Sequence, residues 1–316
     1  MNKIGLAVYG LNIYNARRRK KMLDTVDSGI EFLDILEGFL NEGKKEFDTD
    51  NHAETVFRVE NTERNEIFNE EGQKLYSYIS GVVKTGEFGT ESELVNRKTK
   101  KVTHNKTIDE AEVMPFAFLV AMPCGNIKRG IIILQTEGRY GMKLSFEKRL
   151  KKYMRNLYPD LDFAMGTIAP KEYIERYLRD GFLQEIRMIK YGIPNDVSER
   201  NGLSKKPDAN IYEERIIHNP LGFLDAGAEK IRETLNNQRI FTSIVEIPGF
   251  DYDKLKFKFS QGKTNKTIDM TNLDSITIIE DITDKVGVKK GHPLYSAVKE
   301  EMKRTAEEYL NGMGTL

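Results

Sequence analysis

The chain has 316 residues with 49 basic and 49 acidic side chains, so its zero net charge gives no general attraction to a polyanion. Apolar residues make up 39% of the sequence, which suffices for one large core or two smaller ones. No run approaches the roughly 18 apolar residues that a membrane-spanning helix needs. The single cysteine, Cys124, excludes an intrachain disulfide. We expect a cytoplasmic protein without a signal peptide.

The N-terminal part predicts a strand, a helix and then hairpins. A strand candidate at 4–14 precedes the basic run 17–21. A helix is expected over 28–41, where apolar residues recur on one side and Gly43 provides a stop. From 54 to 107, short β-rich pieces alternate with Gly and Asn, which is typical of an antiparallel sheet.

The middle of the chain contains its most hydrophobic segments. Residues 114–122 and 130–136 are almost wholly apolar, which predicts central strands covered on both faces. A helix over 145–157 follows, then a strand at 161–168. A second helix is expected over 170–181, between Pro170 and Gly181, and a strand closes this half at Ile193.

Residues 194–210 are polar and rich in Pro, Gly, Asn and Ser, which favours a linker. Beyond it we expect a strand at 211–218, an amphipathic helix over 224–235, strands at 239–247, 254–260, 266–270 and 275–281, and a final helix over 294–310. This order predicts an α+β fold, with largely antiparallel sheets and several packed amphipathic helices. The predicted domains are 1–193, with a β-rich segment at about 48–107, and 211–316.

Catalytic motifs are absent from the sequence. The four histidines are isolated, and neither a metal-ligand spacing, a phosphate-binding loop nor a hydrolase elbow occurs. Cys124 lies in an expected turn between apolar strands, where a structural or incidental role is favoured over a nucleophile. We therefore predict no catalytic residue, no metal and no cofactor.

The predicted helix over 145–157 has the most unusual charge distribution. Positions 139–157 carry seven cations against one carboxylate, Glu147. At 100° per residue the apolar side chains share one face and most cations lie opposite, with few carboxylates to form i,i+4 pairs. This pattern favours phosphate contacts over a membrane surface, because the short apolar face is flanked by strands and is expected to pack into a core.

Two other basic clusters stand out. One is the run 17–21, and the other is Arg97, Lys98, Lys100 and Lys101 in an expected hairpin. For any single run, a solvated surface is the simpler interpretation. The predicted nucleic-acid contacts are the helix cations and, second, those of the first run: Lys148, Arg149, Lys151, Lys152, Arg155, Arg17, Arg18, Arg19 and Lys20.

Three functions remain open at this point. The first is sequence-nonspecific binding to the DNA backbone by a homodimer, which would double the number of phosphate contacts. The second is a metal-dependent nuclease, for which Glu185 with Lys190, or Glu91 and Glu93 with Lys98, could supply the residues. The third is an interaction module that binds an acidic protein partner.

The order of several segments resembles that of a known family. The segments are MPFAFLVAM, KRGIIILQTEG, the helix after it, PKEYIERYLRDGFLQEIRMIKY, and KKGHPLYSAVKEEMKRTAEEY near the C-terminus. This layout resembles RexA-like exclusion proteins of lambdoid phages and is similar to KwaB-type anti-phage proteins. The resemblance implies an α+β DNA-binding protein that dimerises, acts in phage defence and partners a membrane effector encoded nearby. It assigns no individual residue.

Overall fold

The computed structural model describes residues 2–27, 29–125, 127–168, 178, 182–191, 212–237, 244–261, 264–271 and 278–312. The chain divides into two compact units. Unit 1 consists of residues 1–167 and 277–316, and unit 2 consists of residues 168–276. Each unit has its own sheet.

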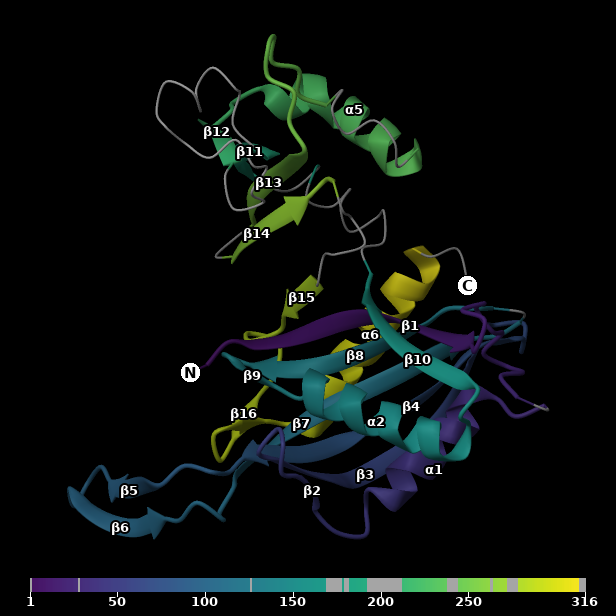
Figure 1. The fold of residues 1–316 in the computed structure, drawn as a ribbon, viewed down its shortest axis with the longest axis vertical. Coiled ribbons are helices and arrows are strands. Elements are labelled where there is room, and N and C mark those ends of the chain that lie inside the picture. Colours follow the sequence, from purple (N-terminus) through teal and green to yellow (C-terminus); the bar gives the residue numbers. More distant parts are fainter. Residues whose placement is uncertain are drawn as a thin grey trace. The chain divides into compact units, whose positions relative to one another are not determined.

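A long antiparallel sheet forms the centre of unit 1 (Figure 1). Its strands run in the order β10 (Leu161–Thr167), β1 (Ile4–Asn15), β8 (Gly130–Glu137), β7 (Glu112–Pro123), β4 (Lys74–Glu87), β3 (Thr55–Phe68) and β2 (Asp48–Asp50). Two short strands join it, β9 (Tyr140–Gly141) on β8 and β15 (Ile278–Asp281) on β1. The apolar runs predicted as central strands are β7 and β8, and both lie in the middle of the sheet.

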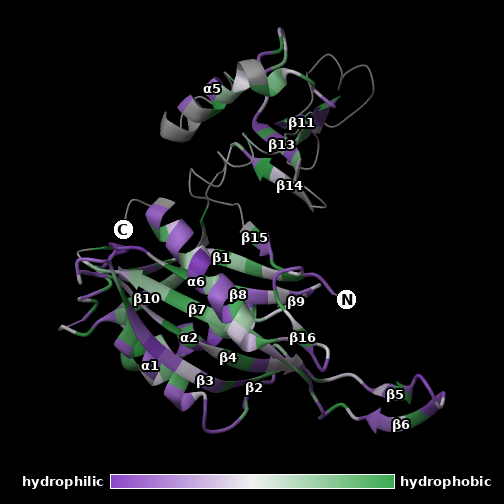
Figure 2. Ribbon diagram, turned by 180° about the vertical axis from the view of Figure 1, so that it is seen from behind, coloured by the Kyte–Doolittle hydropathy of each residue, from purple (hydrophilic) through white to green (hydrophobic). Residues whose placement is uncertain are grey.

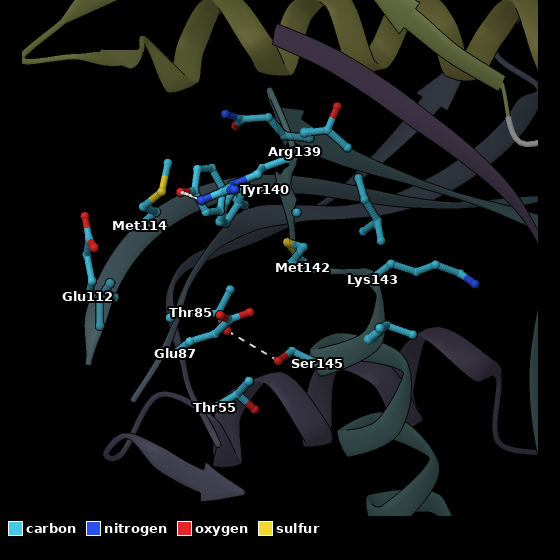
Figure 3. A pocket seen from close by; sticks show the side chains of 18 of the residues that line it. Thr55, Thr85, Glu87, Glu112, Met114, Arg139, Tyr140, Met142, Lys143 and Ser145 are labelled. Atoms are coloured by element: carbon cyan, nitrogen blue, oxygen red, sulfur yellow. Dashed lines mark hydrogen bonds between the residues drawn. The ribbon is translucent and has the colours of Figure 1, made fainter. Parts of the chain in front are cut away.

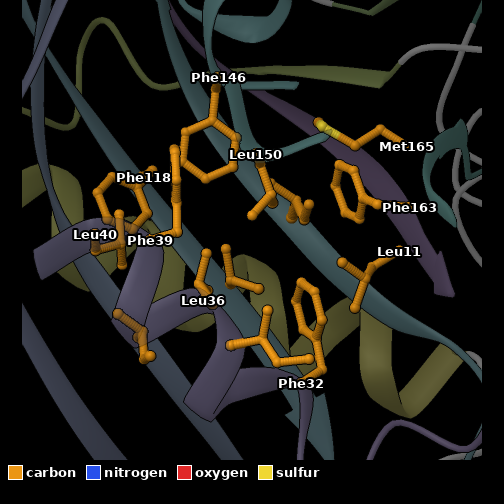
Figure 4. Packing of buried hydrophobic residues seen from close by; sticks show 14 of the residues in the cluster. Leu11, Phe32, Leu36, Phe39, Leu40, Phe118, Phe146, Leu150, Phe163 and Met165 are labelled. Carbon is orange, nitrogen blue, oxygen red and sulfur yellow. The ribbon is translucent and has the colours of Figure 1, made fainter. Parts of the chain in front are cut away.

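Helices cover both faces of this sheet. Helices α1 (Phe32–Glu42) and α2 (Lys143–Leu157) lie on one face, and α6 (Tyr295–Gly312) lies on the other, as Figures 1 and 2 show from opposite sides. The first face holds a large buried core (Figure 4), in which the side chains of Phe39 and Phe118 contact Phe146 of α2 with ring centroids 5.7 Å apart. This core fixes the position of α2.

Helix α6 is held on the other face by apolar packing and by polar contacts. Val298, Met302 and Ala306 are buried against the sheet. The Tyr76 hydroxyl donates a hydrogen bond to Glu307 (3.1 Å), and Lys299 forms an ion pair with Glu63 (2.7 Å). The C-terminal segment is therefore an integral part of unit 1, although it follows unit 2 in the sequence.

Two further hairpins belong to unit 1. Strands β5 (Ser92–Asn96) and β6 (Lys101–Lys106) form a separate two-stranded ribbon, which extends away from the sheet in Figures 1 and 2. Strands β16 (Val288–Lys289) and β17 (His292–Pro293) form a short hairpin before α6.

Unit 2 contains a four-stranded antiparallel sheet in the order β12 (Tyr212–His218), β11 (Phe182–Tyr191), β13 (Lys254–Gln261) and β14 (Thr264–Asp269). Helix α5 (Phe223–Asn237) contributes Phe223, whose ring lies 5.9 Å from that of Phe257 in β13. Ile231 of the same helix is fully buried.

The predicted fold class is wrong in its helical part. The described residues are mostly β, with 48% strand and 21% helix, and they contain four helices. Long strands of up to 14 residues, such as β3 and β4, account for the difference. The largely antiparallel sheets are confirmed.

The helix expected over 170–181 lies outside the described residues except for Leu178, and residues 244–247 of an expected strand are irregular.

The two units also do not follow the expected domain boundaries. Strand β11, which we assigned to the N-terminal domain, pairs with β12 and β13 of the C-terminal part. The segment after unit 2 returns to the N-terminal sheet through β15 and α6. The expected linker 194–210 lies outside the described residues.

Candidate nucleic-acid interface

Helix α2 begins two residues before its predicted start and ends at the predicted residue, Leu157. Phe146, Leu150 and Met154 are buried in the core, as their spacing predicts. The helix is therefore amphipathic in the expected sense, and its cations lie on or beside the other face. Whether these cations can bind a phosphate depends on the residues that surround them.

Arg149 is a structural residue and is no longer a candidate for a phosphate contact. Only 6% of it is exposed, and its Nε donates to the Asp48 carboxylate at 2.6 Å. Its guanidinium also donates to the backbone carbonyls of Asp48 (3.2 Å) and Thr55 (3.0 Å) and lies over the ring of Phe57. These contacts use the donors that a phosphate would need, so Arg149 ties α2 to β2 and β3.

Most other cations of α2 are paired. Lys148 forms an ion pair with Asp50 of β2 at 2.5 Å, and Lys151 and Lys143 both contact Glu147, at 2.8 and 3.6 Å. The contact with Lys148, together with backbone hydrogen bonds, lowers the pKa of Asp50 to about 2. The helix face that looked unbalanced in the sequence is thus largely neutralised by carboxylates of β2 and by Glu147.

Lys152 and Arg155 are the remaining cations of α2. Both are exposed, and the described residues contain no ion-pair partner for either. Lys152 lines a shallow hollow of about 390 Å³ together with Glu42 and Glu46, beyond the end of α1. Lys152 therefore lies in a region of mixed charge.

The run at 17–20 forms a tight turn after β1. The Asn15 side chain accepts hydrogen bonds from the backbone N–H groups of Arg17 (3.1 Å) and Arg19 (2.9 Å), and Arg18 adopts a positive φ of 58°. Arg18 is paired with Asp162 at 3.0 Å, whereas Arg17, Arg19 and Lys20 are exposed without an ion pair among the described residues.

This turn lies beside the end of α2. Strand β10 starts four residues after the helix, and its residues Leu161 and Asp162 pair with Asn15 and Tyr14 at the end of β1. The two predicted clusters therefore meet at one corner of unit 1. We call Arg17, Arg19, Lys20 and Arg155 the corner patch. Lys152 lies apart from it, in the hollow beside Glu42 and Asp48.

The ribbon of β5 and β6 carries a denser cationic cluster at its tip. Arg97, Lys98, Lys100 and Lys101 are all exposed, and the described residues contain no ion pair to any of them. We call these four residues the hairpin tip. The turn is built by Asn96, whose side chain accepts from the backbone N–H groups of Lys98 (2.9 Å) and Thr99 (3.1 Å), while Lys100 adopts a positive φ of 57°.

The ribbon is held only at its base. Its strand residues are exposed apart from half-buried Lys106, so the ribbon has no core of its own. At the base, Gly89 N–H donates to the Ile108 carbonyl (2.8 Å), and the Glu110 carboxylate accepts from Thr107 N–H and contacts His104. These hydrogen bonds hold the pKa of Glu110 below its usual range.

The corner patch and the hairpin tip lie at opposite ends of the sheet. The ribbon connects β4, which ends at Glu87, to β7, which starts at Glu112. This connection lies at the end of the sheet where β1 begins. The corner patch lies where β1 ends, 11 residues later, which corresponds to about 35 Å along the strand. Figure 1 shows this separation within unit 1. The two clusters are therefore separate sites.

The hairpin cluster is visible in the sequence, although the predicted contacts lie on α2 and in the run 17–20. Its signal is the segment Arg97–Lys101, which holds four cations and no carboxylate within a single turn. The helix had a similar composition, but its neighbours in space supply carboxylates. A turn at the end of an isolated ribbon has no such neighbours, because it packs against no other element.

Neither residue set considered for a nuclease is brought together. Glu185 is buried and contacts Arg187 (2.7 Å), whereas Lys190 lies five positions away on the same strand and hence points to the other face. Glu91 and Glu93 lie near the base of the ribbon, away from Lys98 at its tip. In the described part of the chain, no three His, Cys, Asp or Glu side chains gather closely enough to hold a metal ion.

Two further expectations from the sequence concern the reactivity of Cys124 and the presence of membrane-spanning helices. Burial raises the pKa of the Cys124 thiol, which favours its protonated, less reactive form. Within the described ranges, none of the helices has both the length and the apolar character needed to cross a membrane.

No protein-family model matches the sequence, and no curated protein matches it either.

Proposed function

We propose that the protein binds nucleic acid, with DNA as the preferred partner, through sequence-nonspecific contacts between the hairpin tip and the phosphate backbone. The observation that carries this proposal is the group of four exposed cations, without carboxylate partners in the described structure, at the end of a projecting ribbon. Cations in this arrangement repel one another, and a polyanion relieves that repulsion.

The shape of the ribbon suits a duplex. The DNA major groove, about 12 Å wide, admits a two-stranded β-ribbon, and the flanking phosphates then lie within reach of lysine and arginine side chains. Four phosphate contacts predict a slope of about −3.5 for log K against log salt concentration. The exposed apolar side chains of Leu94, Val95 and Val102 would be partly covered by such a partner.

The cellular setting rests on the order of segments that resembles RexA-like and KwaB-type proteins. On that basis we propose a cytoplasmic anti-phage defence role, a homodimer that presents two ribbons, and a membrane effector as a separate partner. A dimer would double the number of phosphate contacts and hence steepen the dependence on salt.

An electrophoretic shift assay with matched variants tests the binding site. Reversing Arg97, Lys98, Lys100 and Lys101 to Glu is expected to lower DNA affinity by at least about tenfold and to flatten the salt slope. The matched control reverses four cations of the corner patch, Arg17, Arg19, Lys20 and Arg155, and retains most of the affinity. Unchanged DNA binding by the hairpin-tip variant would overturn the proposal.

A further inference from the structure

We propose that the edge strand β12 of unit 2 pairs antiparallel with β12 of a second copy of the chain and forms the interface of a symmetric homodimer. This inference rests on the homodimer proposed above and assigns its interface. Strand β12 is the end member of the four-stranded sheet, beside β11 and at the opposite edge from β14 (Figure 1). Its outer edge therefore offers a row of backbone groups that a further strand can bind.

Strand β12 exposes apolar side chains on both of its faces. The exposed fractions are 53% for Tyr212, 38% for Ile216 and 40% for Ile217. Because successive side chains of a strand alternate, Tyr212 and Ile216 lie on one face of the sheet and Ile217 lies on the other. The strand contains neither proline nor lysine, and its register with β11 is uninterrupted. This edge thus lacks the features that usually prevent strands of different chains from pairing.

The other edges of the two large sheets carry such features. Strand β14, at the opposite edge of the same sheet, has Lys266 among polar residues, and its apolar residue Ile268 is buried. In unit 1, the edge strand β2 has only three residues, and two of them are aspartates. The apolar side chains of the edge strand β10 belong to the buried core. Strand β12 is therefore the edge whose sequence and exposure suit a partner strand.

The free backbone groups of β12 belong to its even-numbered residues. Ile189 of β11 lies opposite Glu214, and its carbonyl accepts from Asp253 N–H at 2.8 Å, on the side away from β12. Inward and outward backbone groups alternate along an antiparallel pair, so the N–H and C=O groups of Tyr212, Glu214 and Ile216 point away from β11. These groups can form about six hydrogen bonds with an antiparallel copy centred on Glu214.

In this register the two strands are complementary in charge. Antiparallel pairing centred on Glu214 places Glu213 of each copy opposite Arg215 of the other. The two positions form a non-hydrogen-bonded pair, in which the side chains approach most closely. Both side chains are partly exposed, and within one chain they contact each other at 3.3 Å. The dimer would therefore join two such contacts into one network of four charges.

The remaining pairs of this register are apolar or are balanced within each chain. Tyr212 faces Ile216 of the other copy, and such aromatic and β-branched pairs are favourable across strands. Glu214 meets its own counterpart at the two-fold axis, where like charges repel. Each Glu214 carboxylate, however, contacts Arg187 of its own chain at 3.3 Å, and this cation reduces the repulsion. The register thus covers two apolar side chains of each strand and gives Arg215 a second carboxylate.

Unit 1 contains a cavity of about 920 Å³ in front of α2, but the cations that line it have partners within the chain (Figure 3). Lys143 forms an ion pair with Glu147, and Arg139 donates a hydrogen bond to the Tyr140 hydroxyl at 3.0 Å. The cations of this cavity are therefore balanced inside unit 1. By contrast, β11 is the one strand that pairs with β12 among the described residues, so the outward backbone groups of β12 are available to a second copy.

Reciprocal charge reversals test the interface, with the mass in solution measured by analytical ultracentrifugation in the absence of DNA. Glu213→Arg and Arg215→Glu each place like charges in two contacts of the dimer, so each should raise the dissociation constant at least about tenfold. The double variant restores opposite charges across the interface and should dimerise within about threefold of the unaltered protein. A double variant that dimerises as weakly as the single variants would contradict the register.

Glu233→Arg is the matched control, because it makes the same change at an exposed position of α5. It should leave the dimer intact, and circular dichroism verifies that all variants are folded. A monomeric unaltered protein at about 100 µM would overturn this interface together with the proposed homodimer. A dimeric Glu213→Arg variant would overturn the interface alone.

Proline at two adjacent positions tests the role of the backbone. Ile216→Pro removes an outward N–H, so β12 can still pair with β11 but not with a second copy. Ile217→Pro removes an N–H directed to β11 and should destabilise unit 2 itself. We expect a folded, monomeric Ile216→Pro variant that still binds DNA through its hairpin tip, with a less steep dependence on salt. A dimeric Ile216→Pro variant would contradict the strand pairing.

The hairpin-tip variant separates this interface from the DNA-binding site. With Arg97, Lys98, Lys100 and Lys101 reversed to Glu, the protein should remain dimeric although its DNA affinity falls. A monomeric hairpin-tip variant would place the interface on the ribbon instead of β12.

Discussion

Arg149 illustrates how an arginine in a basic cluster can be a structural residue. Its guanidinium is buried and bonded to Asp48 and to two backbone carbonyls. Arg149→Ala leaves these acceptors without donors and should lower the free energy of unfolding by about 3 kcal/mol, as measured by urea denaturation. Lys152→Ala, an exposed position on the same helix, should change it by less than about 0.5 kcal/mol. Equal effects of both substitutions would contradict this role.

The pair of Lys148 and Asp50 predicts a dependence of stability on pH. The pKa of Asp50 is about 2 in the folded protein, chiefly because of its hydrogen bond to Lys148, against about 3.9 in an unfolded chain. The carboxylate therefore contributes stability that is fully present above about pH 4 and is lost as the pH falls toward 2. In Lys148→Met, NMR titration of the Asp50 carboxyl carbon should give a pKa closer to the ordinary value. An unchanged titration would exclude the contact with Lys148 as the cause.

At the scale of elements, the sequence predicts the position of α2 correctly but not the state of its charges. The spacing of Phe146, Leu150 and Met154 is a local pattern, so periodicity suffices to find the helix and its buried face. Lys143 and Lys151 pair locally with Glu147, but the carboxylates that pair with Lys148 and Arg149 come from β2, about a hundred positions earlier in the chain. No local pattern contains that information, because it depends on the pairing of β2 with β3 at the edge of the sheet.

The ribbon of β5 and β6 is expected to be dispensable for folding. Its residues bury almost no surface, so replacing residues 93–105 with the two-residue turn Asn-Gly should change the free energy of unfolding by less than about 1 kcal/mol. The same variant should lose DNA affinity, since it lacks the hairpin tip. Denaturation with urea and an electrophoretic shift assay measure the two effects. A large loss of stability would show that the ribbon packs on the body of unit 1.

On the scale of the whole molecule, unit 2 is inserted within one edge of the sheet of unit 1. Strand β10 pairs with β1 as far as Thr167 opposite Tyr9, and β15 resumes on the same edge with Ile278 opposite Val8. Strand periodicity predicts both segments, but it cannot show that β10 and β15 pair one after the other with the same strand, β1. The composition of residues 194–210 suggested a domain boundary between β11 and β12. The strand pairing shows no such boundary, because β11 pairs with both β12 and β13 inside unit 2.

This arrangement predicts that unit 1 folds without unit 2. Val8 and Tyr9 are adjacent in β1, so their partners in β15 and β10 lie about one strand step apart, and a short Gly-Ser linker can join Thr167 to Ile278. We expect the joined protein to unfold in one cooperative transition by differential scanning calorimetry. A chain that ends at Thr167 is the matched control. It lacks β15 and α6, exposes Leu6, Val8 and Ile133 on the uncovered face of the sheet, and should show no such transition. Cooperative unfolding of that shorter chain, or its absence from the joined protein, would contradict the insertion.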